Sequence, residues 1–254
     1  MKIGLTTCFN RGTIDGKIYN YLYENFIKFD PYSFNKNNKG FRWNKSKHVK
    51  EIANATTKDR ISFLDETGNF FLASGIFLNE SFQAITIEQD YMLFDLKNSD
   101  VEDIINYSEG FISANLFNVE YTLVQSNSSE TIFEDRQMNP EILGSLSKTP
   151  FKLDMFGKRD YDVRFNPGRE VRTNQAILMA SWKMWFGKAF FEIIPKQRLL
   201  SFPYAIEVKE LKDDLVYIQL FDKVEESHTT ESVFRQWKWQ EWIDYDKLVE
   251  QFPD

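Results

Sequence analysis

Short segments of alternating apolar and polar residues, each closed by a turn signal, restrict the fold of this chain more than any other feature. Ile61–Leu64 runs into Asp65-Glu66-Thr67-Gly68, where the glycine supplies the positive φ that a short hairpin needs. Similar segments predict further strands at residues 70–78, 82–87, 91–94, 118–124, 204–210 and 215–221. Hairpins and meanders of this kind are typical of antiparallel sheets.

A few helices are expected between these strands. Apolar residues at near-helical spacing predict a helix over 17–29, and a capping-box pattern over 99–102 opens another. Residues 195–198 are expected to form a short helical turn. The chain from residue 230 to its end is predicted to be mostly helical, with a break at Asp244.

Three segments are harder to assign. Residues 35–60 carry eight Lys and Arg against two carboxylates and are rich in Asn, which predicts a solvated basic loop, with a dedicated anion site as the alternative. Residues 151–165 contain short strand-like runs that end at a turn signal. The aromatic-rich segment 176–194 alternates in character around Met184, so we predict a strand pair rather than a helix.

Together these elements predict an α+β fold with a largely antiparallel sheet, or sheets, and a few packed helices. The regular strand–helix alternation of a parallel doubly wound sheet is missing. With 254 residues the chain fits one domain, 1–254, or two lobes, 1–125 and 150–254, joined by the polar segment 125–149. Such a chain buries enough surface to need no disulfide or metal staples.

The residues needed for common catalytic chemistry are scarce. Cys8 is the single cysteine, and His48 and His228 are the two histidines, so disulfide frameworks and multi-residue Cys/His metal sites are not expected. The phosphate-loop, dinucleotide-binding, nucleophile-elbow and zinc-protease motifs are absent from the sequence. We therefore expect no enzyme activity and no cofactor. No signal-like or membrane-spanning apolar run is present, so a cytoplasmic protein without a membrane partner is expected.

One pattern favours an enzyme instead. Glu207 and Lys209 lie two apart on a predicted strand and so point to the same face. Restriction-type nucleases use such a Glu-x-Lys with an upstream aspartate to hold Mg²⁺ and activate water. The nearest upstream aspartate, Asp162, is 45 residues away. A metal-dependent nuclease is thus the alternative function, although the same pair also occurs on any exposed amphipathic strand.

The distribution of charge indicates what kind of partner the chain binds. The formal net charge is −7, and residues 195–254 hold thirteen acidic against eight basic residues. A surface of this sign repels nucleic acid and attracts cationic proteins. We therefore expect a cationic protein partner and no nucleic acid, with a merely solubilising acidic surface as the alternative.

Two acidic clusters are candidates for the contact with such a partner. One is Asp100, Glu102 and Asp103 at the start of the helix expected near residue 100. We favour the other, where carboxylates precede a tryptophan-rich helix and tryptophans could supply a buried interface anchor. The tentative partner-binding residues are Asp222, Glu225, Glu226, Glu231, Trp237 and Trp242.

The strand 215–222, the acidic loop 222–231 and the helix 234–250 together resemble the immunity proteins of bacterial polymorphic toxin systems. Those proteins are small and cytoplasmic, and they bind and neutralise a cognate toxin, often one with a basic active-site cleft. The resemblance implies a non-catalytic binding protein, and it assigns no role to any single residue. A structural or regulatory protein-interaction module is a further alternative.

Overall fold

The structure is a computed structural model of the 254-residue chain. The residues that it describes are 2–10, 15–26, 31–56, 58–64, 70–71, 76–77, 82–90, 119–126, 151–153, 155–157, 159–161, 167–168, 171–173, 176–211, 215–223, 226 and 229–252.

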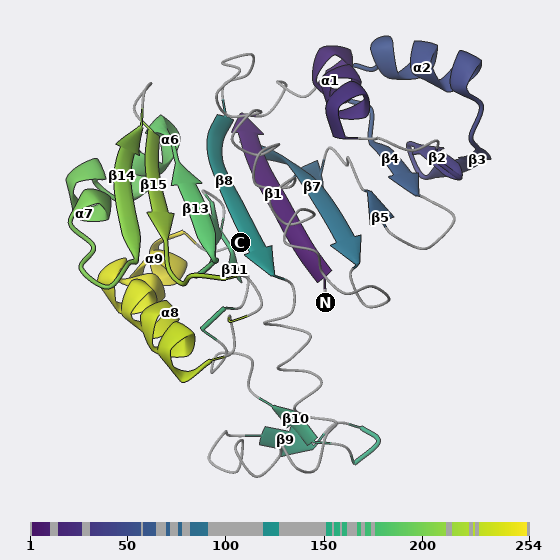
Figure 1. The fold of residues 1–254 in the computed structure, drawn as a ribbon. Coiled ribbons are helices and arrows are strands. Elements are labelled where there is room, and N and C mark those ends of the chain that lie inside the picture. The colour runs from purple at the N-terminus through teal and green to yellow at the C-terminus, as the bar shows by residue number, and fades with distance from the viewer. Residues whose placement is uncertain are drawn as a thin grey trace.

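The described residues form an α+β fold built around a seven-stranded sheet (Figure 1). Its strand order is β14-β15-β13-β8-β1-β7-β6, and each pair of neighbours is antiparallel. The strands are β1 (Lys2–Asn10), β6 (Ile76–Phe77), β7 (Phe82–Asp90), β8 (Val119–Ser126), β13 (Lys183–Phe186), β14 (Glu207–Leu211) and β15 (Leu215–Gln219). The predicted fold class is therefore confirmed.

The pairing of β8 with β13 joins the two halves of the chain. Val124 on β8 lies opposite Lys183 on β13, although most of the polar segment 125–149 lies between the two strands in sequence. Strands from before and after that segment thus belong to one continuous sheet.

A smaller four-stranded antiparallel sheet lies near the end of the large sheet that carries β7 (Figure 1). Its order is β3-β2-β4-β5, from the strands β2 (Ser33–Lys36), β3 (Lys39–Arg42), β4 (Ile61–Leu64) and β5 (Phe70–Phe71). Helices α1 (Gly16–Phe26) and α2 (Lys45–Ala53) pack against each other beside it. The helix predicted over 17–29 and the hairpin around residues 65–68 are confirmed by α1 and by the β4–β5 pair.

The prediction that residues 35–60 form a solvated loop is wrong. Two consecutive asparagines with positive φ, Asn37 and Asn38, make the tight turn of a β2–β3 hairpin. Asn44 then caps helix α2 by accepting from the Lys47 N–H at 3.1 Å. The two strands are short, and the buried residues of the helix are His48 and Ile52. The many lysines therefore leave no apolar pattern from which the hairpin or the helix could be predicted.

The C-terminal part follows the predicted plan more closely. The hairpin of β14 and β15 forms as expected, and α7 (Lys196–Leu200) begins directly after Pro195. Helix α8 (Thr230–Trp242) is followed by α9 (Tyr245–Gln251), and the break falls at Asp244, whose φ is 54°. The segment 176–194 divides into β12 (Ile177–Leu178), β13 and the helix α6 (Lys188–Ile193). The predicted strand pair is wrong, because β12 and β13 belong to different sheets and the last part of the segment is helical.

Two small antiparallel pairs complete the described elements. They are β9 (Phe151–Leu153) with β10 (Arg159–Tyr161), and β11 (Val171–Arg172) with β12. The β9–β10 turn carries the apolar side chains of Met155 and Phe156, which are 89% and 80% exposed. The strand expected over 91–94 and the helix expected near residue 100 lie outside the described residues.

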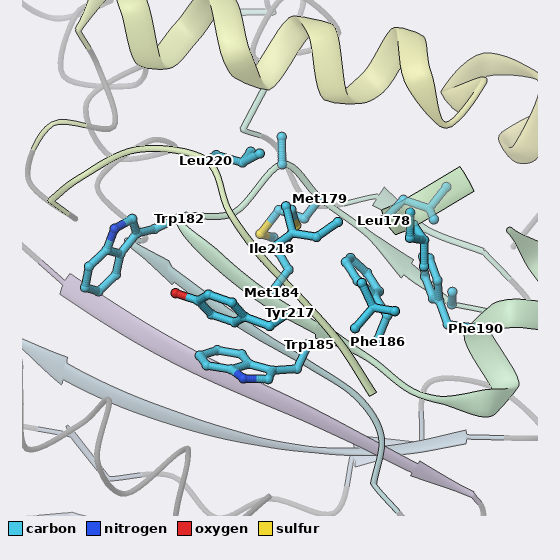
Figure 2. Close-up of a cluster of buried hydrophobic side chains, with 14 of the residues drawn as sticks. Leu178, Met179, Trp182, Met184, Trp185, Phe186, Phe190, Tyr217, Ile218 and Leu220 are labelled. Carbon is cyan, nitrogen blue, oxygen red and sulfur yellow. The ribbon is translucent and has the colours of Figure 1, made fainter. Parts of the chain in front are cut away.

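The core lies mainly under β13 and β15, where both faces of the strands are buried (Figure 2). Trp185 and Tyr217 pair across the two strands with ring centroids 5.1 Å apart. On the opposite face Phe186 packs against Phe190 of α6 and Trp239 of α8, with centroids 4.4 and 5.5 Å away. These contacts fix α8, the helix expected to bind a partner, against the sheet.

Candidate functional site

The turn between β15 and α8 holds the predicted acidic residues. Asp222 is exposed, Glu226 is half-buried and Glu231 is exposed at the start of α8. Backbone hydrogen bonds from Glu226 N–H to Lys223 O and from Thr229 N–H to Glu226 O shape this turn. Glu225 lies outside the described residues, as does the whole of the alternative cluster of Asp100, Glu102 and Asp103.

The predicted aromatic anchors are already engaged within the protein to different degrees. Trp239, which lies between the two predicted anchors in the sequence, is 1% exposed and belongs to the core. Trp242 is half-buried, and its indole N–H donates to the carbonyl of Arg198 at 2.8 Å. Trp237 is also half-buried. The sheet-facing side of α8 therefore uses its tryptophans mainly for packing.

A different set of apolar side chains is exposed beside the acidic turn. Tyr204 and Ile206 precede the edge strand β14, Phe234 projects from α8, and all three are between 40% and 44% exposed. Tyr204 and Phe234 meet edge to face with centroids 5.8 Å apart and an interplanar angle of 86°. We call these three residues the Phe234 surface. It adjoins the end of β15, three residues before Asp222, because the Ile206 N–H donates to the carbonyl of Gln219 at 2.8 Å.

Ion pairs surround the Phe234 surface. Arg235 contacts Glu231 at 3.0 Å and donates to the carbonyl of Tyr204 at 2.8 Å. Lys238 contacts Glu241 at 2.6 Å, and its ammonium lies 5.7 Å from the Phe234 ring centroid. The hydrogen bond to Glu241 raises the pKa of Lys238 above its ordinary value. Two of the carboxylates on the outer side of α8 thus hold cations of this chain.

The geometry of the helix explains this arrangement. Glu231, Phe234, Lys238 and Glu241 recur at helical spacing along one side of α8, and the buried residues occupy the other side. Phe234 could be recognised in the sequence as an aromatic residue off the face of Trp239. Tyr204 and Ile206 were missed, because alternation on an edge strand does not reveal which of its ends lies against a helix.

Glu207 and Lys209 point to the same side of β14, as the sequence predicts, and they pair with each other at 2.5 Å. Asp162 lies outside the described residues. Within the part of the chain that is described, no group of three or more His, Cys, Asp or Glu side chains is placed to hold a metal ion.

His48 lies in an aromatic cluster of the small sheet. It is 2% exposed and stacks on Phe34 with centroids 4.5 Å apart. Burial lowers its pKa, an effect that Glu51 opposes and Lys47 reinforces. The Asn44 N–H donates to its Nδ1 at 3.0 Å, which requires that nitrogen to be unprotonated. His48 is a packed, neutral core residue.

Comparison with protein-family models, with curated proteins and with solved structures finds no match to this chain. Among the described residues, no helix is both long and apolar enough to cross a membrane.

Proposed function

We propose that this protein is a non-catalytic binding protein that neutralises a cationic toxin in the cytoplasm, in the manner of polymorphic-toxin immunity proteins. The observation that carries the proposal is the Phe234 surface, where three partly exposed apolar side chains lie among carboxylates at one end of the large sheet. Aromatic side chains ringed by polar contacts are typical of interface hot spots.

The ion pairs around Phe234 suit a cationic partner. Glu231 and Glu241 are exposed, and surface salt bridges contribute about 0–1 kcal/mol each, so a lysine or arginine of the partner could join Arg235 or Lys238 at these carboxylates at little cost. Among the described residues, Asp222 and Glu226 hold no cation and would attract the partner at longer range. Relative to the set expected from sequence, Phe234 and Tyr204 thus replace Trp237 and Trp242 as anchors.

A co-expression experiment tests the proposal. The probe is the C-terminal domain encoded by the gene immediately upstream of this one, produced in a host whose growth it arrests. Co-expression of the native chain should restore growth, and Phe234→Asp should abolish the rescue. A non-toxic neighbour, or a toxic one that this chain fails to neutralise, would contradict the proposal.

Binding kinetics with the same domain test the role of charge. The Debye length falls from about 30 Å at 0.01 M to about 10 Å at 0.1 M salt, so the association rate should fall steeply over this range. The dissociation rate should change less. Reversal of Asp222, Glu225 and Glu226 to Lys should slow association, whereas Glu192→Lys, an exposed charge on the distant α6, should not. An unchanged association rate in the triple variant would remove the acidic turn from the interface.

A further inference from the structure

The small N-terminal sheet and helix α2 concentrate positive charge in a chain that is negative overall. Residues 35–60 hold eight Lys and Arg against Glu51 and Asp59, a local +6 in a protein of −7. Both carboxylates already pair with lysines of this segment. Glu51 lies 3.7 Å from Lys47, and Asp59 lies 3.5 Å from Lys36 and accepts hydrogen bonds from Asn37 and Thr56.

Several of these cations have no counter-charge. Lys39 and Arg42 on β3 and Lys50 on α2 are exposed and have no carboxylate partner among the described residues. Strand β3 is the outer strand of its sheet, and all four of its residues are exposed. Helix α2 begins after two intervening residues and packs on this strand, since the ring centroids of His48 and Phe41 lie 5.9 Å apart. We call Lys39, Phe41, Arg42, Lys45, Lys47 and Lys50 the β3–α2 surface.

Stability of the fold does not account for the lysines on this surface. Lys45 and Lys47 lie in the first turn of α2, which has no acidic residue. The helix dipole favours negative charge at that end, so cations there are mildly destabilising. Like charges gathered close together also repel one another. Such an arrangement indicates a surface that meets an anion.

Aromatic rings lie beside the cations. Phe41 is 38% exposed, and the Lys47 ammonium lies 5.3 Å from its centroid. Tyr32 is 53% exposed, and its carbonyl accepts from the Trp43 N–H at the end of the same hairpin. A ring that is open on one face next to lysines can stack on an unpaired base while the cations contact phosphates.

We propose that the β3–α2 surface binds single-stranded nucleic acid. Cations spread along a sheet edge match a chain of phosphates, and the exposed rings of Tyr32 and Phe41 favour a strand whose bases are accessible over a duplex whose bases are hidden. An acidic protein would satisfy the cations but would leave the two rings without a specific role.

This inference departs from the expectation, based on net charge, that the chain has no nucleic-acid partner. Net charge averages over the molecule, whereas phosphates respond to charges within about one Debye length, roughly 10 Å at 0.1 M salt. Figure 1 places α2 and β3 at one end of the large sheet and α8 at the other. The proposal therefore uses a different surface from the toxin-binding proposal, and each can fail without the other.

Fluorescence anisotropy with a labelled 12-nucleotide oligo(dT) and oligo(U) tests the proposal on the full chain. Three to four phosphate contacts predict an affinity that falls about 20- to 50-fold between 50 and 200 mM salt, since single strands contribute a slope of about −0.7 per contact. The triple variant Lys39→Gln, Arg42→Gln, Lys50→Gln should reduce that slope by about 2. Tyr32→Ser should weaken binding about 5-fold or more at all salt concentrations, because it removes a stacking ring but no charge.

A matched control separates local from overall charge. The variant Lys188→Gln, Lys223→Gln, Lys247→Gln removes three exposed cations elsewhere and should bind like the native chain. An equal loss of affinity in both triple variants would overturn the proposal, as would the absence of oligonucleotide binding. Equal affinity for a duplex, or for polyglutamate as a model of an acidic protein, would overturn it as well.

Discussion

The indole N–H of Trp239 donates a hydrogen bond to the backbone carbonyl of Met179 at 3.1 Å, and so links helix α8 to the segment that precedes β13. Both residues are buried. The same indole ring stacks on Phe186 and meets the ring of Phe202 edge to face, with ring centroids 5.5 and 5.3 Å away. Trp239 therefore helps to fix the position of α8, and with it the Phe234 surface, together with the bonds that Gln240 and Trp242 donate to the carbonyls of Pro167 and Arg198.

Replacing Trp239 with Phe should lower the free energy of unfolding by about 1–3 kcal/mol, because the Met179 carbonyl is left buried without a donor. Trp242→Phe is the matched control. It removes a similar bond to the Arg198 carbonyl, but that carbonyl still accepts from the Ser201 hydroxyl at 3.1 Å, so the loss should stay below about 1 kcal/mol. Urea denaturation of both variants measures the difference. Equal losses would show that the Trp239 bond adds nothing beyond packing.

Gly16 allows the start of α1 to approach the end of α2. Its N–H donates to the Ala55 carbonyl at 2.8 Å, and a Cβ at this position would lie 2.3 Å from the Ala53 carbonyl oxygen. Gly16→Ala should therefore destabilise the protein by about 1–3 kcal/mol, although alanine is the better helix former. At Gly40 the added Cβ meets the Asn35 Oδ1, the end of a side chain that can move. Gly40→Ala should thus stay within about 0.5 kcal/mol in the same thermal unfolding assay. A stabilising Gly16→Ala would contradict the close approach.

Asp59 makes the stability of the small sheet depend on pH. Burial opposes its charged form, but hydrogen bonds from Thr56 and Asn37, together with Lys36, lower the pKa of Asp59 to about 2. Its unfolded pKa is near 4, so the carboxylate stabilises the fold above about pH 4, and this contribution is lost as the pH falls through about 2. The shift corresponds to at most about 2.5 kcal/mol, and we expect about 1 kcal/mol because solvent screens part of it.

The variant Asp59→Asn tests this contribution. Its deficit against the native chain in urea denaturation should be full at pH 7 and smaller at pH 3. The exposed Asp222→Asn should show no deficit at either pH. A deficit of constant size would mean that ionisation of Asp59 adds nothing to stability, and it would contradict the lowered pKa.

The sequence predicts those helices and strands that have one buried, apolar face and one exposed, polar face. It does not predict the elements that are buried, or exposed, on both faces. Helix α1, the β14–β15 hairpin and the break at Asp244 follow from periodicity and turn residues. The segment 176–194 is ambiguous because Met184, Trp185 and Phe186 are all buried, which removes the alternation that marks a strand. In residues 35–60, every residue of β3 is exposed, so no apolar pattern reveals the strand.

The candidate site was predicted only in part, for a similar reason. Composition identifies the acidic turn and the aromatic helix, since both are contiguous in sequence. The pairing of Tyr204 with Phe234 joins residues 30 positions apart through the packing of α8 beside β14, and no local pattern encodes it. Glu231 and Glu241 pair with cations three or four residues away on the same helix. A count of charged residues does not show that these carboxylates are already paired.

The last prediction separates a binding protein from a nuclease. Glu207 and Lys209 neutralise each other on the edge strand β14, and Glu207 is half-buried while Lys209 is exposed. If the pair is only a surface ion pair, replacing both residues with Ala should change the free energy of unfolding by less than about 1 kcal/mol. The purified native chain should leave single- and double-stranded DNA and RNA intact in Mg²⁺ or Mn²⁺. Cleavage that requires the metal and disappears in Glu207→Ala, while the Glu210→Ala control on the same strand retains it, would instead make this edge of the sheet a metal-dependent active site.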